Sequence, residues 1–319
     1  MRRKLQACPV ERLRGMRDVL EIQDAIIAAA KSSLERQGFL EIRPPIIASA
    51  TDPGLRGAKQ FEVDFYGKRW KVTSSMILQK MLAASALGKV FSISPCLRKE
   101  PLSARKTGRH LCEFWQIDVE LSGASRDRAM EVAETILRDI MREIMPVVKK
   151  KLGKELKVPK LPFKRLPYKE ALKLAEKLGF SIEEGKEIPW EAEKAISMQF
   201  DEPFFIVDYP TGSRGFYDKI YPKQREKLLA FDMIYPKGFG EAVSGSQRED
   251  IPELITKKLK QVGEKPRIYS WYLDLLKKSR IKPTAGFGFG LERLTRFVCG
   301  LERVEQAAPF PKLPGEVSV

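Results

Sequence analysis

The stretch RKEPLSARKTGRHLCEFWQIDVEL, residues 98–121, decides the fold and holds the only histidine of the chain. Both of its ends have the composition of strands, and a polar, basic loop joins them. Arg98 and Glu100 share one face of the first strand, because alternate side chains of a strand point the same way. Arg109 and His110 stand where the loop ends. The stretch therefore predicts two strands with charged groups gathered on one face.

The second strand of this pair adds one aromatic and two polar side chains. Phe114, Gln116 and Asp118 alternate along it and so share a face. An arginine fork suits a phosphate, a carboxylate such as Glu100 suits an amine, and an aromatic ring suits a base. The set predicts a nucleotide site in which His110 donates to a terminal phosphate and need not act as a base. A surface hairpin with salt-bridged charges is the alternative for this stretch alone.

A second stretch, GFGFGLERL at residues 286–294, supports the nucleotide site. Glycines that alternate with aromatic residues leave one face of a strand bare, so that a flat ligand can lie against the backbone. Glu292 and Arg293 then begin a helix, near the positive end of its dipole. By itself the stretch also suits a packing strand that meets a buried helix. Together the two stretches favour the ligand site.

The rest of the chain mixes helical and strand patterns without a regular βαβ alternation. This arrangement indicates an α+β fold with a mainly antiparallel sheet flanked by helices. We expect one domain over residues 1–319, with at most a small inserted lobe around residues 145–200. Helices are expected at residues 17–37, 74–88, 126–145, 168–179, 190–198, 255–262, 271–279 and 291–300, and strands at 63–73 (a hairpin), 89–100, 110–121, 204–209, 230–236, 240–246 and 286–290.

The chain is strongly basic, with a formal charge of +16. Such a balance is typical of proteins with polyanionic partners such as nucleic acid or nucleotides, and also of lysine-rich thermophilic surfaces. Residues 149–165, KKKLGKELKVPKLPFKR, concentrate the charge. Either a solvated connector or an RNA-binding surface fits this segment.

The four cysteines are widely spaced and form no CxxC pair. The sequence therefore indicates neither a zinc site nor a disulfide framework, and a reducing cytoplasm is the expected location. Residues 1–15 lack the apolar run of a signal peptide, and no stretch is long enough to span a bilayer, so no membrane association is expected.

Three ordered motifs resemble those of the class II aminoacyl-tRNA synthetases, over essentially the whole chain. The first is GFLEIRPPII, residues 38–47, with Pro45 as its proline; the second spans residues 97–120, and the third is GFGFGLERL. GEAVSGSQRE, residues 240–249, further resembles the aspartate, asparagine and lysine subgroup. The resemblance implies the class II antiparallel sheet, ATP as a substrate, and a homodimer with the first motif in its interface.

The resemblance also implies roles for single residues. Arg98 would grip the α-phosphate of ATP and the reacting carboxylate, and Arg109 and His110 would hold the β- and γ-phosphates. No nucleophilic side chain is needed, because positioning and charge neutralisation lower the barrier. The other implied ATP-binding residues are Glu100 at the adenine amine, Phe114 and Arg293 on the two faces of the ring, and Gly290; the implied Mg²⁺ ligands are Asp232, Glu241 and Ser244, whose oxygens suit a hard cation.

Aspartate is the expected substrate. Lys80 and Arg248 fall where the aspartyl enzymes hold the second carboxylate, and two cations in a closed site favour a carboxylate over a neutral amide. Gln116 and Asp118 match the aspartyl pattern Gln-x-Asp. The helix opening SSMI departs from the aspartyl Gln-Ser-Pro-Gln. The alternative for Lys80 is a helix lysine whose stem covers apolar surface.

Ammonia is the expected acceptor. Only 16 residues precede the first expected helix, which is too few for an anticodon-binding barrel. Several short motifs resemble the tRNA-independent asparagine synthetases related to asparaginyl-tRNA synthetase: Thr51-Asp52-Pro53, residues 75–80, Gly108, Phe216-Tyr217-Asp218 and residues 309–315. Those enzymes adenylate the side-chain carboxylate of aspartate, and ammonia then displaces AMP to give asparagine.

In that family, Lys80 and Arg248 would hold the α-carboxylate and Asp52 the α-ammonium. Asp218 would orient ammonia as a third catalytic residue beside Arg98 and Arg293, although a loop cap or salt bridge is an equal alternative for it. The rival function is a truncated aspartyl- or asparaginyl-tRNA synthetase paralogue that acts on or binds tRNA. The sequence leaves open which aspartate carboxylate faces ATP.

Overall fold

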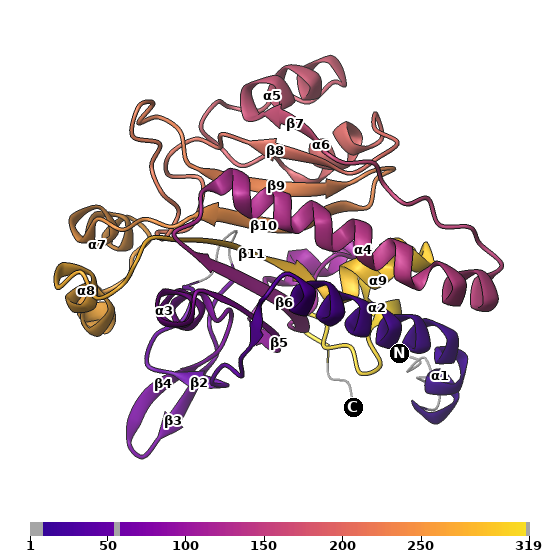
Figure 1. Ribbon diagram of the computed structural model, residues 1–319, viewed down its shortest axis with the longest axis horizontal. Coiled ribbons are helices and arrows are strands. Elements are labelled where there is room, and N and C mark those ends of the chain that lie inside the picture. The colour runs from indigo at the N-terminus through magenta and orange to yellow at the C-terminus, as the bar shows by residue number, and fades with distance from the viewer. Residues whose placement is uncertain (1–8, 54–57, 317–319) are drawn as a thin grey trace, which may run out of the picture.

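A computed structural model describes residues 9–53 and 58–316 (Figure 1). Its strands are β1 (Leu40–Glu41), β2 (Ile47–Ala48), β3 (Glu62–Phe65), β4 (Lys68–Val72), β5 (Lys89–Leu97), β6 (Glu113–Ser122), β7 (Lys164–Pro167), β8 (Phe204–Val207), β9 (Ala230–Tyr235), β10 (Gly240–Gln247) and β11 (Thr284–Gly290). Eight of them form one sheet in the order β1-β5-β6-β11-β10-β9-β8-β7. Neighbours are antiparallel except at the two edges, where β1 pairs with β5 and β7 with β8 in parallel. The predicted α+β fold with a mainly antiparallel sheet is confirmed.

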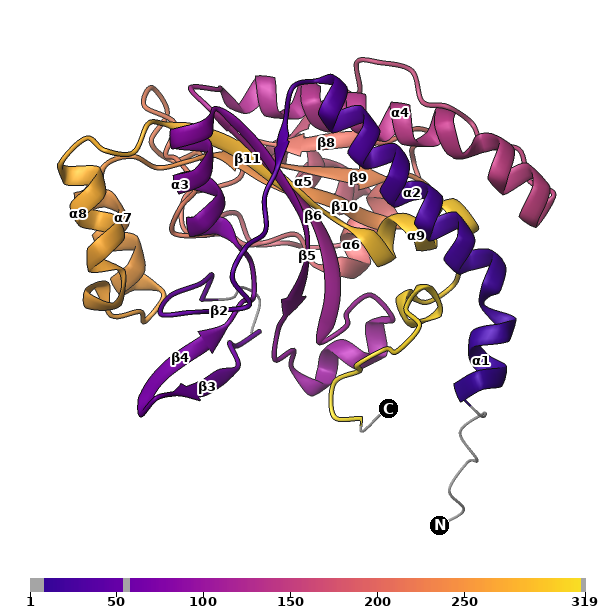
Figure 2. The same ribbon diagram turned by 60° about the horizontal axis from the view of Figure 1, so that its bottom comes forward.

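Helices cover one face of this sheet. The helices are α1 (Pro9–Gly15), α2 (Arg17–Arg36), α3 (Ile77–Leu87), α4 (Arg126–Leu152), α5 (Tyr168–Lys177), α6 (Trp190–Ser197), α7 (Pro252–Gln261), α8 (Ser270–Lys277) and α9 (Leu291–Cys299). Of these, α2, α4 and α9 pack across the same face, as Figures 1 and 2 show. Ile117 and Val119 on β6 and Phe287 and Phe289 on β11 point into this layer and are fully buried. The intervening residues of both strands therefore face the other way.

The opposite face of the sheet is covered only at its two ends. At one end α3 contacts β5, β6 and β11, and at the other α5 and α6 pack near β7, β8 and β10. The middle of the face carries polar side chains and glycines from β6, β10 and β11. Residues 145–200 supply β7, α5 and α6, and β7 extends the main sheet at its edge. None of the described helices is long and apolar enough to cross a membrane.

Helix α4 is longer than the sequence predicts. It begins at the N-cap Ser125, which accepts from the backbone N–H of Arg128, and runs past Pro146 to a left-handed Gly153. Buried Val148, with partly buried Val147 and Leu152, continues its apolar face beyond the predicted end. The basic segment 149–165 thus begins as helix. Several of its lysines bind neighbouring carboxylates: Lys149 to Glu155, Lys151 to Asp18 and Glu21, and Lys157 to Glu202.

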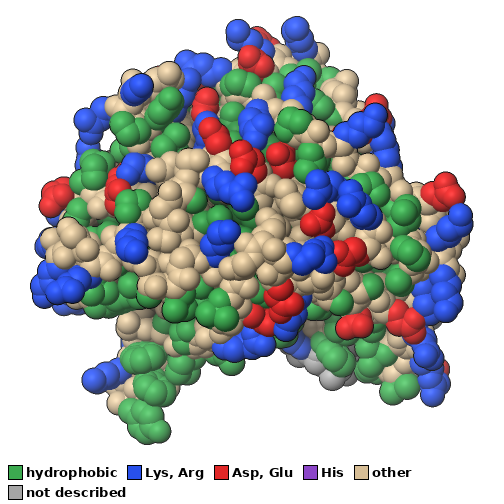
Figure 3. Space-filling view, in the orientation of Figure 1, with side chains coloured by type: hydrophobic (Ala, Val, Ile, Leu, Met, Phe, Trp, Pro, Cys, Tyr) green, Lys and Arg blue, Asp and Glu red, His purple; other side chains and the backbone are tan. Residues whose placement is uncertain are grey.

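A second, small sheet of order β2-β4-β3 projects from the body. Tyr66 and Gly67 make its turn with positive φ, as the predicted hairpin requires. Phe65, Tyr66 and Trp70 cluster at the tip, and Figure 3 shows hydrophobic side chains gathered on this projection. The strand expected at residues 89–100 ends at Leu97, and within the loop expected at residues 101–109 Leu102–Thr107 form a 3-10 helix.

Candidate active site

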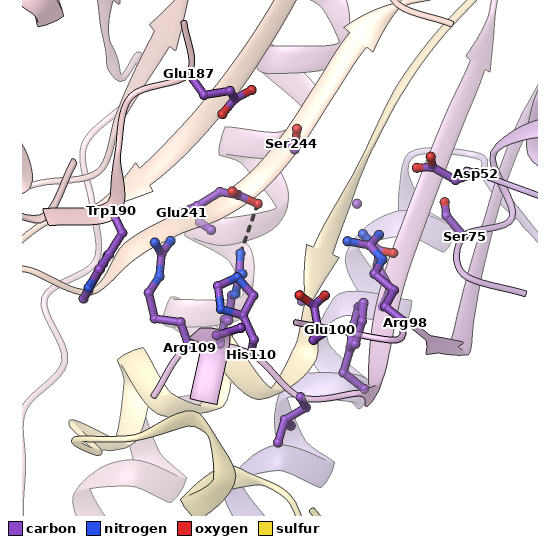
Figure 4. Close-up of a pocket in the computed structure, with 18 of the residues that line it drawn as sticks. Asp52, Ser75, Arg98, Glu100, Arg109, His110, Glu187, Trp190, Glu241 and Ser244 are labelled. Atoms are coloured by element: carbon purple, nitrogen blue, oxygen red, sulfur yellow. Dashed lines mark hydrogen bonds and ion pairs between the residues drawn. The ribbon is translucent and has the colours of Figure 1, made fainter. Parts of the chain in front are cut away.

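A pocket of about 670 Å³ opens on the uncovered face of the main sheet, between α3 and α6 (Figure 4). Its floor consists of residues from β6, β10 and β11 that point away from the helical layer. All but one of the site residues that the sequence predicts line it: Asp52, Lys80, Arg98, Glu100, Arg109, His110, Phe114, Gln116, Asp118, Asp218, Glu241, Ser244, Arg248, Gly290 and Arg293.

The glycines of β11 have two different surroundings. A Cβ at Gly286 would lie 2.0 Å from Glu120 Oε2, and one at Gly288 would lie 2.2 Å from Gln116 Nε2. At Gly290 the nearest atom is Cδ of Arg293 at 3.6 Å, an ordinary contact. The prediction that the whole strand is bare for a ligand is therefore corrected. Two of its glycines make room for side chains of the neighbouring strand β6.

Arg98 lies in the middle of the pocket. Its Nε donates to the backbone oxygen of Ser74 at 3.2 Å, and its guanidinium carbon lies 5.1 Å from the centre of the Phe114 ring. The backbone N–H of Arg98 donates to Cys112 O at 2.8 Å, so the two strands keep their pairing where the loop begins. The hydrogen bond to Ser74 and the contact with one face of the Phe114 ring fix the position of the Arg98 guanidinium.

Three more cationic or polar groups lie at the outer end. Arg109 Nη2 lies 3.0 Å from Glu193 Oε1, and Arg293 Nη1 lies 3.0 Å from Glu241 Oε1. The Nδ1 atom of His110 lies 3.1 Å from the Thr107 hydroxyl. Figure 4 shows Arg109 and His110 close together beside Glu241. Two arginines and a histidine that converge in this way are suited to a polyphosphate.

The C-terminal segment holds the loop that carries Arg109 and His110. The backbone N–H of Val304 donates to Gly108 O at 2.9 Å, and that of Cys112 donates to Lys312 O at 2.7 Å. Gly108 has φ +63°, and a Cβ on it would lie 3.2 Å from the Arg303 guanidinium. A larger residue at this position would be strained and crowded.

The inner end of the pocket contains two buried cations that are already paired. Lys80 Nζ lies 2.6 Å from Asp118 Oδ1 and donates to Phe287 O at 3.1 Å. Arg248 makes two hydrogen bonds to Glu120, from Nε at 3.0 Å and from Nη2 at 2.9 Å. Two unpaired cations would favour a substrate carboxylate, but both of these cations have an acidic partner. In the structure such a carboxylate would share each cation with an acidic side chain.

Asp218 also lies at the inner end. It is buried, accepts a hydrogen bond from Ser246, and its Oδ1 lies 3.8 Å from Arg248 Nη1. Burial raises the pKa of this carboxyl, and Arg248 and the Ser246 hydrogen bond oppose that rise. Nearby, the Tyr217 hydroxyl donates to Asp52 Oδ2 at 2.9 Å. Both aspartates that the sequence predicts for polar substrate groups thus line this end.

Glu292, at the start of α9, holds the first residues of β6. Both of its carboxylate oxygens accept from the backbone N–H of Trp115, each at 3.1 Å. Burial raises the pKa of Glu292 to about 7, and the backbone hydrogen bonds work against that shift. The residue therefore changes charge near neutral pH.

Asp232 is the one predicted site residue that does not line the pocket. It is fully buried, and both of its oxygens accept from Arg214, at 3.2 and 2.5 Å. The Tyr209 hydroxyl donates to the same carboxylate at 2.9 Å. An aspartate engaged in this way does not fit a magnesium ligand. The sequence around Asp232 does not reveal this ion pair, because Arg214 lies in a separate loop and only the folded chain brings the two residues together.

Two oxygen donors remain for the predicted magnesium ion. Glu241 and Ser244 both line the pocket, and hard cations that arrive with a polyphosphate often use only one or two protein oxygens. Within residues 9–53 and 58–316, no group of three or more His, Cys, Asp or Glu side chains is arranged to hold a metal. Glu241 and Ser244 therefore fit an ion that is carried largely by phosphate oxygens.

Sequence reasoning missed several residues of the pocket. Trp190 and Glu193 come from the first turn of α6, which the sequence predicts only as a helix, and Glu187 lies in the segment just before it. Arg214 lies in the loop before Asp218. Trp190 next to Pro189 is a weak sign of a functional contact, but no local pattern in the sequence indicates which segment its ring contacts.

Comparison with known proteins agrees with this geometry. The family described as tRNA synthetases class II (D, K and N) matches residues 2–314. The chain belongs to this family, which confirms the resemblance seen in its three motifs.

Within the family, the chain is similar to asparagine–tRNA ligases. The enzyme of Pyrococcus abyssi is 33% identical over 305 residues, which are 94% of this chain and 69% of the relative. The enzyme of Thermococcus kodakarensis is also 33% identical, over 94% of this chain and 70% of the relative.

The fold agrees as well. Asparaginyl-tRNA synthetase from Pyrococcus horikoshii, solved with asparaginyl-adenylate, superposes with a TM-score of 0.87 at 31% identity and covers 95% of this chain and 70% of its own. The Entamoeba histolytica enzyme has a TM-score of 0.85 at 23% identity, which is evidence for the fold alone.

Proposed function

We propose that this chain is an ATP-dependent ligase that activates aspartate, or its amide asparagine, as an adenylate. The observation that carries the proposal is the order of groups along one pocket. At one end of the pocket floor, Arg248 pairs with Glu120 and Lys80 pairs with Asp118, both on β6. Closer to the start of β6, Arg98 lies over Phe114. At the start of β10, Arg293 pairs with Glu241, and Arg109 lies beside Gly240 and His110. This order suits an amino acid, an α-phosphate and a polyphosphate.

Within this proposal the side chains bind and orient and do not react. Arg98 would neutralise charge on the α-phosphate as the carboxylate attacks in line. Phe114 and Gly290 leave room for the adenine ring, with Glu100 at its amine. Magnesium, when bound, would neutralise phosphate charge, and Glu241 and Ser244 are the donors that would hold it.

Exchange of pyrophosphate into ATP tests the activation step. It should require Mg²⁺ and one of the two amino acids, and the preferred one identifies the substrate. Aspartate is our expectation from Gln116 and Asp118. The ion pairs of Lys80 and Arg248 leave asparagine as the rival, in line with the adenylate in the P. horikoshii structure.

Arg98→Ala should lower the exchange rate about a hundredfold, because a contact made in the transition state is lost. Lys99→Ala, an exposed neighbour on the same strand end, is the matched control. Full exchange activity in the Arg98 variant would exclude this pocket as the site of activation.

For the acceptor, transfer RNA is supported by the relatives, since the enzymes 33% identical to this chain are asparagine–tRNA ligases. On this reading the +16 charge serves RNA binding. The basic segment 149–165 contributes less than its composition indicates, because several of its lysines are paired within the protein.

Ammonia is the second candidate, and the position of Asp218 favours it. This buried carboxylate lines the amino-acid end of the pocket, where it would hold ammonium next to the adenylate. Ammonium would lose a proton and attack as ammonia, so that aspartate, ATP and ammonium yield asparagine, AMP, pyrophosphate and a proton, with no ADP. Asparagine formed without RNA would support ammonia as the acceptor. Labelled amino acid attached to bulk tRNA, with no free asparagine, would support transfer RNA.

A further inference from the structure

We propose that residues 187–193, which lead into α6 and form its first turn, act as a clamp that positions Arg109 for the terminal phosphates of ATP. This inference rests on the proposed function and adds Trp190 and Glu193 as positioning residues. They lie outside the three family motifs and come from the segment between α5 and β8.

The first observation is the packing of Arg109. It is buried, at 6% exposure, yet it lines the pocket. Its guanidinium carbon lies 4.1 Å from the centre of the Trp190 ring, and its Nη2 lies 3.0 Å from Glu193 Oε1. The ring sets the plane of the guanidinium and the carboxylate sets its rotation within that plane. Figure 4 shows the Trp190 ring beside the Arg109 side chain.

The second observation is that the clamp is attached to the sheet at both ends. Glu193 Oε1 also accepts from the backbone N–H of Glu241 at 3.1 Å, at the start of β10. Glu187 lies 3.0 Å from Arg214 Nε, and Arg214 is paired with buried Asp232 on β9. This gives Asp232 a function other than metal binding: it anchors the segment that holds Arg109.

The third observation is the close approach at Gly240. A Cβ there would lie 3.0 Å from Glu193 Oε1, 3.1 Å from Arg109 Nη2 and 3.2 Å from Trp190 Cζ3. The three side chains therefore converge on one backbone position, which has φ +75° and favours glycine. Such convergence fixes the side chain before the ligand arrives, which lowers the entropy cost of binding.

The position of the clamp predicts a selective effect. Arg109 lies at the outer end of the pocket, so the clamp should matter for the β- and γ-phosphates and not for adenosine or the α-phosphate. Trp190→Ala should weaken ATP binding about tenfold, as expected for loss of a desolvated cation–π contact. AMP binding should change less than twofold. Trp190→Phe should recover most of the loss, because it keeps an aromatic face.

The decisive experiment measures dissociation constants for ATP and AMP by calorimetry in the wild type, Trp190→Ala, Arg109→Ala and the double variant. Since Trp190 acts through Arg109, the double variant should bind ATP no more weakly than Arg109→Ala alone. Lys194→Ala is the control: its amine lies 5.6 Å from the Trp190 ring, but the residue is exposed and does not line the pocket.

Equal losses of affinity for ATP and AMP, or additive losses of ATP affinity in the double variant, would contradict the clamp. Trp190 would then serve only in packing. Retained AMP binding also shows that each variant is folded. If the wild type binds neither nucleotide, the proposed function fails as well. If the wild type binds ATP but Trp190→Ala binds it equally well, only the clamp fails.

Discussion

Arg248 and Glu120 form a two-point ion pair that spans three strands of the sheet. Arg248 follows β10, Glu120 lies on β6, and β11 runs between them. Gly286 is the residue of β11 at the crossing, paired with Glu120 on one side and Ser246 on the other. The pair passes over this glycine because it has no side chain, and both charged groups are at most 4% exposed.

Gly286→Ala should lower the free energy of unfolding by about 2–3 kcal/mol. Its Cβ would lie 2.0 Å from Glu120 Oε2 and 2.3 Å from the backbone oxygen of Val119, so the backbone itself must shift. Gly290→Ala is the matched control, with an expected loss below about 1 kcal/mol, since its nearest neighbour is 3.6 Å away. Urea unfolding of both variants measures the difference, and equal losses would contradict this account.

Glu292 should make stability fall as the pH rises. Its pKa is raised by burial to about 7 in the folded chain, above its usual value of 4.5. The contribution of Glu292 to the free energy of unfolding is therefore complete below about pH 4.5 and is lost as the pH rises through 7. Glu292→Gln should reduce the drop in unfolding free energy between pH 5 and pH 8 by up to about 3 kcal/mol. An unchanged pH profile would show that Glu292 does not titrate in this range.

Asp218→Asn should slow transfer to ammonia about tenfold more than it slows pyrophosphate exchange, if ammonia is the acceptor. The variant loses a buried negative charge beside Ser246 and Arg248 that would hold ammonium after the adenylate has formed. Product formation and exchange are measured on the same preparation. Parallel losses in both reactions would place Asp218 in amino-acid binding instead.

If the first motif forms the homodimer interface that the family resemblance implies, Ile46→Glu should shift the protein from dimer to monomer. Ile46 and Leu40 belong to the first motif and are 65% and 54% exposed, which suits an interface that a second copy covers. Val262→Glu, at a 44% exposed site after α7, is the control for a charge on an apolar surface position. Light scattering at micromolar concentration gives the mass, and a monomeric wild type would contradict the proposed homodimer.

Local patterns in the sequence were sufficient for most of the helices and strands and for the motif residues of the pocket, but not for Trp190, Glu193 or Arg214. The glycine–phenylalanine alternation of β11 and the apolar stripe of α2 are properties of short segments. They predict a strand and a helix where the structure has them. The motif residues Arg98, Arg109, His110 and Arg293 all line one pocket.

Tertiary structure alone decided which partners these side chains have. Asp232 binds Arg214, the space above Gly286 is filled by Glu120, and Arg109 is held by Trp190 and Glu193. Each of these contacts joins segments that are distant in the chain, and a buried charge takes the nearest suitable partner in space. A motif determines which group a residue offers. Whether that group meets a ligand or another side chain depends on how the sheet and its covering segments pack.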